Sequence, residues 1–179
     1  MKGCIAILML CYCFQYVVCQ TTWQKDSTMY MTAYQHIKND SIFSGKLIAV
    51  TDSIVDLDRY CLDCLKKEFP EEYEKLKVYR KNKKYPYFYT YYSYFYTYYS
   101  PLLAFLFRNQ DVEQASAILF FSNIEDLMLR ADVNFYDKTY ISNKFKYEEY
   151  IWGISYEYLF IFDENATLRK VVRSEFQLN

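Results

Sequence analysis

Residues 154–178 read ISYEYLFIFDENATLRKVVRSEFQL, and the expected fold rests first on this segment. Its first part alternates Ile154, Tyr156, Tyr158, Phe160 and Phe162 with Ser155, Glu157, Leu159 and Ile161. Asp163-Glu164-Asn165-Ala166 then has the composition of a turn. Beyond the turn we expect Leu168, Val172, Phe176 and Leu178 on one face, opposite Arg169, Arg173 and Glu175. Two alternating segments around a turn predict a β-hairpin.

The segment before this hairpin is also strand-like from about residue 112 onward. Leu127, Leu129, Ala131, Val133 and Phe135 alternate with Met128, Arg130, Asp132, Asn134 and Tyr136. Such strict alternation predicts an antiparallel strand that is buried on one face only.

The first half of the chain shows helical periodicity instead. Residues 23–38 carry apolar side chains at helical spacing, and residues 54–65 repeat that pattern. Pro70 opens a third helix over residues 70–82, with acids in its first turn and bases at its end. A short apolar run at residues 47–50 predicts one buried strand. The fold class expected is therefore a β-dominated α+β domain, N-terminal helices followed by an antiparallel meander, with closure into a barrel as one form of that sheet.

Residues 1–19 have the features of a secretory signal peptide. Lys2 precedes an apolar run from Ile5 to Val18, which is short for a membrane span, and polar residues follow at once. Cleavage after Cys19 would leave a single secreted, extracellular domain at residues 20–179, without a Gly-, Pro- or Ser-rich linker. A membrane anchor is the alternative, but no basic stop-transfer cluster follows the run.

Cysteines and glycosylation sequons agree with export. Of six cysteines, only Cys61 and Cys64 lie outside the signal peptide, so a core rather than a disulfide framework must hold the fold. Their C-x-x-C spacing favours a structural disulfide or two core thiols over redox catalysis, because Leu62 and Asp63 separate them. Asn39 and Asn165 each begin an N-x-S/T sequon, expected in exposed turns.

A seven-residue repeat marks the middle of the chain. Residues 87–93 read YFYTYYS, and residues 94–100 repeat them without change. An odd repeat moves every copied side chain to the other face of a strand, so we expect two strands or one strand covered on both faces. Duplication of low-complexity sequence without a function is the alternative.

The composition excludes several classes of chemistry. The chain has one histidine, His36. A zinc site built from His and Cys, or a Ser-His-Asp triad, would have to use this residue, which argues against both. Glycine-rich phosphate loops are absent, and the formal net charge of −1 gives no electrostatic footprint for nucleic acid. We therefore expect a protein that is not an enzyme, with no metal, no cofactor and no nucleic-acid partner. A secreted enzyme built on paired carboxylates is the alternative that these absences leave open.

The 22 tyrosines suggest three roles: an aromatic core, a ligand pocket or a crosslinked structural protein. Tyrosine has an apolar ring and a hydrogen-bonding tip, which suits an amphipathic ligand, and Asp132 or Glu157 could hold a cationic amine. The candidate cavity residues are Tyr96, Tyr98, Asp132, Trp152 and Tyr156. Trp152 precedes Gly153, and a glycine within a strand often marks a bulge.

The overall plan resembles the salivary lipocalins of blood-feeding arthropods, the tick type in particular. The resemblance rests on the signal peptide, Trp23 before a helix, a strand at 45–51, and an aromatic second half containing Phe120-Phe121-Ser122-Asn123 and Val133-Asn134-Phe135-Tyr136-Asp137. The Gly-x-Trp motif and the long-range disulfide pairs of that family are missing, and a helix at 70–82 would be an insertion. The resemblance implies an eight-stranded barrel that holds a small amine or lipid, or a surface that binds host proteins.

The leading hypothesis is a secreted, non-enzymatic binding protein that sequesters a small amphipathic molecule or engages a host protein. The alternative is a tyrosine-rich structural or adhesive secreted protein.

Overall fold

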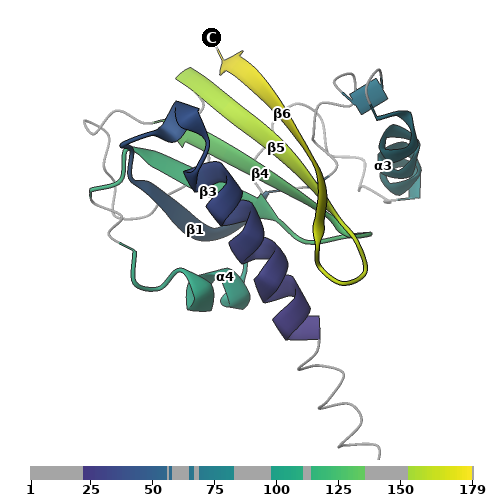
Figure 1. Cartoon of the computed structure of the whole chain (residues 1–179), viewed down its shortest axis with the longest axis horizontal. Helices are drawn as coiled ribbons and strands as arrows, with labels where there is room; N and C mark the ends of the chain where they lie inside the picture. Colours follow the sequence, from purple (N-terminus) through teal and green to yellow (C-terminus); the bar gives the residue numbers. More distant parts are fainter. Residues whose placement is uncertain are drawn as a thin grey trace, which may run out of the picture.

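A single six-stranded sheet forms the centre of the molecule (Figure 1). The computed structural model describes residues 22–55, 57, 65–66, 69–82, 98–110, 114–135 and 153–178. The strands are β1 (Ile48–Val55), β2 (Tyr98–Tyr99), β3 (Ala117–Ser122), β4 (Met128–Phe135), β5 (Gly153–Phe162) and β6 (Leu168–Leu178). Their order is β2-β1-β3-β4-β5-β6, and only the β1–β3 pair is parallel. The expected antiparallel meander is therefore present in β3 to β6.

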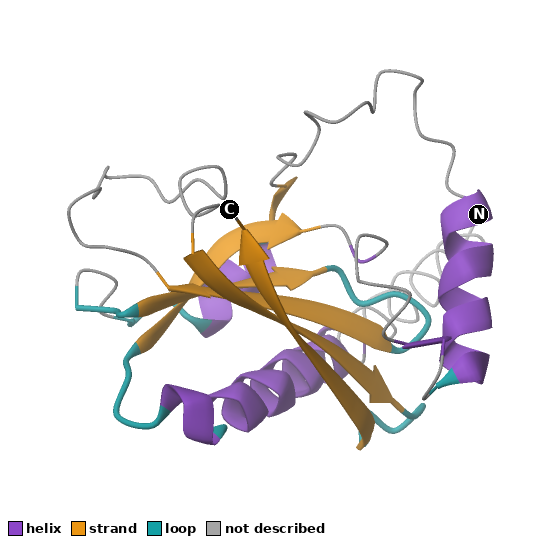
Figure 2. Cartoon of the chain, turned by 90° about the horizontal axis from the view of Figure 1, so that it is seen from above, coloured by secondary structure: helices purple, strands orange, loops and turns teal. Residues whose placement is uncertain are grey.

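Residues 22–38 form a helix that crosses one face of this sheet, which we call the helix face (Figure 2). Its buried positions follow the helical period, because 29, 33 and 37 are each four residues apart. They pack with the aromatic side chains of β5, which all point to this face. The residues of this cluster include Met29, Tyr30, Ala33, Ile37, Phe121, Leu129, Val133, Tyr156, Tyr158 and Phe160. The helix predicted over residues 23–38 is confirmed.

The opposite face of the sheet, the α3 face, is covered at one end by α3 (Pro70–Asn82). Leu76 of α3 is buried in one cluster with Met128, Leu159 and Val172 of the sheet. Glu72, in the first turn of the helix, accepts a hydrogen bond from Lys170 of β6 at 2.7 Å. The helix predicted over residues 70–82 is confirmed at both ends.

Three expectations about strands are wrong. Ile54 does not begin a helix, because β1 continues through Val55 and pairs Ile54 with Tyr98 and with Phe121. The strand β4 is buried on both faces rather than one. Its polar side chains Arg130, Asp132 and Asn134 are buried too.

The third error concerns the face of β6. Leu168 joins the core of the helix face, whereas Val172 joins the core of the α3 face. The register shifts between Ile161, which pairs with Lys170, and Phe162, which pairs with Leu168. Arg169 is therefore an extra residue of β6, a bulge with no opposite residue in β5. After this bulge the residues of β6 lie on the opposite faces from those that simple alternation predicts.

The sheet is open rather than closed into a barrel. Among the described residues, β2 and β6 each have a neighbouring strand on one side only. The space between the helix and the sheet is filled by side chains such as Phe43 and Phe121. The eight-stranded barrel implied by the lipocalin resemblance is therefore not what these six strands form.

Several expectations lie outside the described residues. These are the signal peptide at 1–19, the Cys61–Cys64 pair, Tyr96, Trp152 and all of the repeat except its last three positions. Within the part that the structure describes, no helix combines the length and the apolar character needed to cross a membrane.

Asp40 joins the end of the first helix to two strands. Its Oδ2 atom accepts hydrogen bonds from Tyr158 at 2.9 Å and from Arg173 at 2.8 Å, and its Oδ1 atom accepts from the Ile42 amide. Burial alone would raise the pKa of Asp40, but these donors together hold the pKa below its ordinary value. Burial, and then Asp40 itself, raises the pKa of Tyr158.

We predict that Asp40→Asn lowers the free energy of unfolding at neutral pH by about 1 kcal/mol, a modest loss because Arg173 is 47% exposed and screened by solvent. The pKa of Asp40 is lower in the native protein than in the unfolded chain, where it is near 4. The carboxylate therefore stabilises the native protein above that pH, and this stabilisation is lost as the pH falls through the lower native pKa. The variant should therefore show a smaller loss of stability in acid than the wild type, measured by chemical denaturation from pH 7 to pH 3. Asp52→Asn, at an exposed position of β1, is the control. Equal acid dependence in Asp40→Asn and wild type would contradict this role.

Candidate functional site

A group of charged side chains is buried on the α3 face, where β4 and β5 pair. Arg130 donates from Nε and Nη2 to the two carboxylate oxygens of Asp132 at 2.7 and 2.6 Å. Nη2 also donates to Oε1 of Glu157 at 2.8 Å. The side chains of Arg130, Asp132 and Glu157 are only 4%, 0% and 14% exposed. We call these three residues the ion network.

The sheet register explains why these residues meet. Asp132 lies directly opposite Glu157, and Arg130 is two positions from Asp132 on the same face. Ser122 of β3 supports the strand, since its hydroxyl accepts from the Arg130 amide at 2.9 Å. Next to the network, Ser155 donates to Asn134 across the same two strands.

The ion network changes the role expected for Asp132. Both of its oxygens accept from Arg130, so the guanidinium compensates the carboxylate that was expected to hold a cationic amine. Removing the charges of Arg130 and Asp132 from water costs free energy. The two parallel hydrogen bonds between them are the main interaction that offsets this cost. Its clearest role is to hold β4 and β5 in register.

Asp132 and Tyr156 do not line one cavity. Asp132 pairs with Glu157 on the α3 face, whereas Tyr156 pairs with Val133 and points to the helix face. There the ring of Tyr156 packs edge-on against Phe43, with centroids 5.7 Å apart. The side chains of Tyr96, Tyr98 and Trp152 lie outside the described residues, although the backbone of Tyr98 pairs with Ile54 in β2.

Both sequons lie in exposed turns. Asn39 follows the first helix, and Asn165 is at the tip of the β5–β6 hairpin. Asp163 shapes that tip, because its Oδ1 atom accepts from the amides of Asn165 and Thr167 at 2.9 Å each. Both asparagine side chains are exposed.

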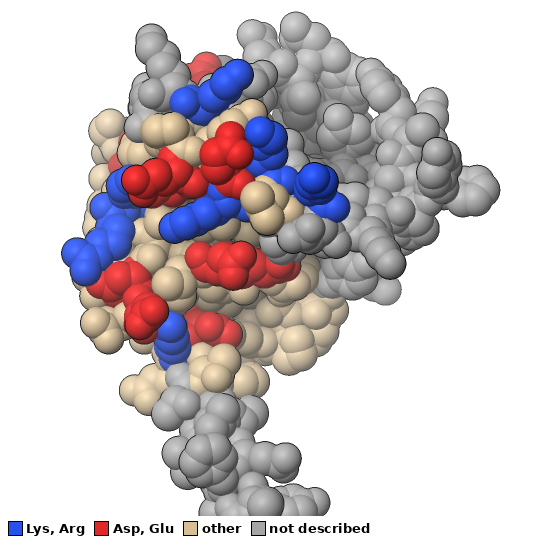
Figure 3. Space-filling model, turned by 90° about the vertical axis from the view of Figure 1, so that its right-hand side faces the viewer, with Lys and Arg blue, Asp and Glu red and all other residues tan. Residues whose placement is uncertain are grey.

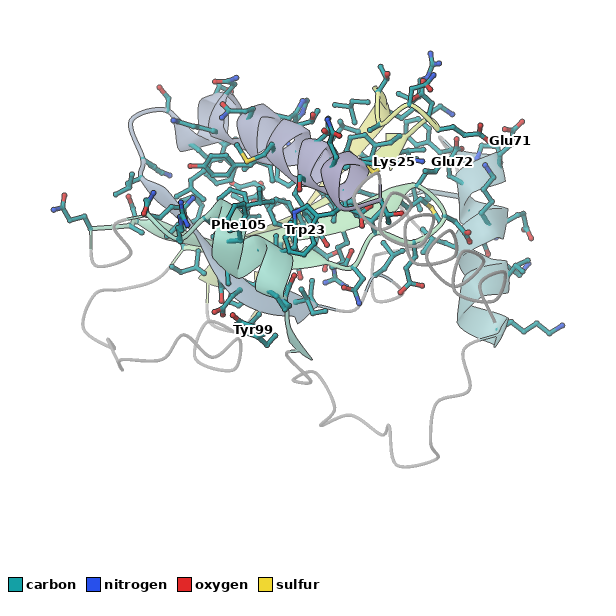
Figure 4. The ribbon with its side chains drawn as sticks, turned by 90° about the horizontal axis from the view of Figure 1, so that it is seen from below. Trp23, Lys25, Glu71, Glu72, Tyr99 and Phe105 are labelled. Carbon is teal, nitrogen blue, oxygen red and sulfur yellow. The ribbon has the colours of Figure 1, made fainter. Side chains whose placement is uncertain are left out.

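Two exposed aromatic side chains lie where the first helix begins and α4 (Pro101–Leu106) ends. Trp23 is 46% exposed and Phe105 is 54% exposed. Their rings meet edge to face with centroids 6.4 Å apart, as Figure 4 shows from below. The guanidinium of Arg108 lies 5.1 Å from the centroid of Phe105. We call these three residues the aromatic surface.

Local structure forces Phe105 outward. In α4 the buried positions are Leu103 and, just after the helix, Phe107, so Phe105 between them points away from the core. Tyr34 packs on Phe107 at 5.2 Å and fixes α4 beside the first helix. Helix α4 was not expected, although Ser100-Pro101 is a helix-start signal: Ser100 caps the helix by accepting a hydrogen bond from the Leu103 amide.

The side of the molecule around α3 has a different character. Lysine and arginine side chains alternate there with aspartate and glutamate (Figure 3). Two of the ion pairs are Glu74 with Lys77, at 3.3 Å, and Glu72 with Lys170. Such interspersed charge suits a solvated surface, whereas the aromatic surface exposes apolar rings. Among the described residues, no group of three or more His, Cys, Asp or Glu side chains is arranged to hold a metal ion.

Comparison with protein-family models, with curated proteins and with solved structures gave no match in any of the three.

We predict that Arg130→Met destabilises the protein by about 3 kcal/mol, because it leaves buried carboxylates without the guanidinium that compensates them. Thermal and urea unfolding should both show this loss. The triple variant Arg130→Met/Asp132→Leu/Glu157→Leu should recover most of the stability, since the uncompensated charges are gone. Arg169→Met, which removes the exposed ion pair with Asp163, is the control and should change stability by less than about 1 kcal/mol. A single Arg130→Met variant as stable as the wild type would show that the ion network does not hold the strands.

Proposed function

We propose that this chain is a secreted, non-enzymatic binding protein that engages a partner protein through the aromatic surface of Trp23, Phe105 and Arg108. The observation that carries the proposal is the exposure of two adjacent large aromatic rings from two different elements, with a guanidinium against one of them. Tryptophan and arginine are enriched among the residues that dominate binding energy in protein interfaces.

The energetics of the two rings favour burial by a partner. An exposed Trp or Phe keeps a large apolar area in water, and covering it contributes on the order of 25 cal/mol per Å². Trp23 and Phe105 are also held in place: the first helix and α4 pack on the sheet through buried neighbours. Little conformational entropy is then lost when the partner binds.

The cation beside the rings indicates the chemistry of the partner. Arg108 is exposed next to Phe105, and a guanidinium pairs most strongly with carboxylates. The complementary surface would present an apolar side chain flanked by aspartate or glutamate. A host extracellular protein of this kind agrees with the salivary-lipocalin resemblance of the sequence.

The filled space beneath the first helix supports a surface partner over a small guest. Side chains of the helix-face cluster pack between the first helix and the sheet. On the other face, Arg130 already bonds to both Asp132 and Glu157. A small amphipathic ligand would have to displace these contacts, whereas a partner protein needs only the surface.

We predict that Trp23→Ser and Phe105→Ser each weaken partner binding by at least about tenfold, the effect expected of a residue central to an interface. The probe is a panel of purified extracellular proteins tested against the secreted chain by biolayer interferometry. Val78→Ser on α3, which is also 54% exposed, is the matched control and should bind as the wild type does. All three variants should keep the unfolding temperature, because the changes are on the surface.

Two results would contradict this proposal. One is a panel in which no protein binds the wild-type chain. The other is a partner whose affinity is lowered equally by Val78→Ser, or by neither Trp23→Ser nor Phe105→Ser.

A further inference from the structure

Helix α3 is attached to the sheet through few of its side chains. Of the α3 side chains that the structure describes, Leu76 is the one buried apolar residue, and Tyr73 is partly buried. The first helix, by contrast, buries four apolar side chains: Met29, Tyr30, Ala33 and Ile37. Figures 1 and 2 show α3 at the margin of the molecule, beside one end of the sheet. Apolar burial therefore stabilises the docking of α3 much less than that of the first helix.

One ion pair adds to this attachment. Lys170 of β6 donates to Oε1 of Glu72 at 2.7 Å, and its ammonium lies 5.2 Å from the ring centroid of Phe69, just before the helix. The side chain of Glu72 is 8% exposed and that of Lys170 is 42% exposed. Burial alone would raise the pKa of Glu72, but the hydrogen bond from Lys170 holds this pKa below its ordinary value. Glu72 is therefore ionised at neutral pH, and we call Glu72 and Lys170 the α3 ion pair.

The sheet beneath α3 is held together by contacts of its own. Leu76 packs in one cluster with Met128 of β4, Leu159 of β5 and Val172 of β6. These three strands also pair with one another through their backbone ladders. Loss of the α3 contacts removes no strand pairing, so the sheet can stay folded while the helix leaves it.

We propose that α3 opens away from the sheet as one unit while the six strands stay folded, and that the α3 ion pair controls how often it opens. In the open state the apolar side chains of the sheet beneath Leu76 face water. Elements with few buried apolar contacts open in this way, because their free energy of opening lies well below that of global unfolding. A helix of 13 residues is also marginally stable in water without packing. The opening concerns the α3 face and is independent of the aromatic surface.

Hydrogen exchange of the full chain, measured by mass spectrometry, tests the opening. After correction for intrinsic rates, we expect the backbone amides of α3 to exchange at least about tenfold faster than those of β5. The α3 rate should also depend more weakly on urea, because a local opening exposes less surface than global unfolding does. Equal rates with equal urea dependence would show that α3 and the sheet unfold together. That result, or an α3 with no protection at all, overturns the proposal.

A substitution in the sheet separates local opening from global unfolding. Val133 is buried in the helix-face cluster, on the other side of the sheet from α3. Val133→Ala should raise the exchange rate of β5 roughly tenfold, because it removes buried methyl groups and leaves a cavity. The α3 rate should stay unchanged, since the open state keeps the sheet intact. An equal rise in both rates contradicts a local opening.

Substitutions in the α3 ion pair test what controls the opening. Glu72→Gln should raise the α3 exchange rate roughly fivefold, because it removes the charge that Lys170 pairs with. Glu74→Gln is the matched control: it makes the same change two residues along the helix, where the pair with Lys77 is exposed. It should change the α3 rate by less than about twofold. Equal acceleration by both substitutions would assign the effect to the charge of the helix itself and not to docking.

The other member of the pair gives an independent readout. Lys170→Met changes no residue of α3, yet it should raise the α3 exchange rate as Glu72→Gln does. The double variant Glu72→Gln/Lys170→Met should exchange more slowly than the product of the two single effects requires, because both remove one interaction. An α3 rate that Lys170→Met leaves unchanged, or two effects that simply multiply, overturns the role of the ion pair. These measurements involve no partner protein, so their failure is distinct from failure of the proposed function.

Discussion

The fold depends on the packing of the first helix against the aromatic side chains of β5. Tyr156, Tyr158 and Phe160 all point to the helix face, because strand residues two apart share a face. The helix offers Met29, Ala33 and Ile37 in return, at the spacing of its own period. Tyr158 reaches beyond this core to Asp40, so the end of the helix is fixed in both position and direction. The geometry of α4, and with it the aromatic surface, follows from this arrangement.

The other face of the sheet is organised by charge as well as by apolar contacts. Leu76 of α3 packs on one end, and the ion network occupies the region where β4 and β5 pair. An apolar face alone would tolerate a shift of the strands by two residues, whereas such a shift would change the contact between Arg130 of β4 and Glu157 of β5. Buried polar groups of this kind favour one register over its neighbours.

Sequence patterns predicted the helices and strands more reliably than the burial and the faces of their side chains. The hairpin, the helix at 70–82 and the meander followed from periodicity, which depends on short-range geometry alone. The burial of Arg130 and Asp132 could not be seen, because alternation indicates which side chains share a face but not whether another layer covers it. The face of Val172 was misassigned because one bulge residue reverses the alternation after it. The exposed position of Phe105 was missed because α4 is a single short helix, too brief for a period to show.

The cap at Ser100 has a consequence for how the chain can vary in length. Two identical seven-residue copies precede Pro101, and only the second copy ends in a serine followed by proline. The Ser100 amide is held by the Asp52 carbonyl of β1, at 2.8 Å, and α3 is held on the sheet by its own contacts. Gaining or losing one seven-residue copy would change the length of chain between these two anchors, and the closure entropy would change by well under about 1 kcal/mol. A chain with one copy fewer would thus keep the serine cap, the proline after it and every other described strand and helix unchanged in sequence.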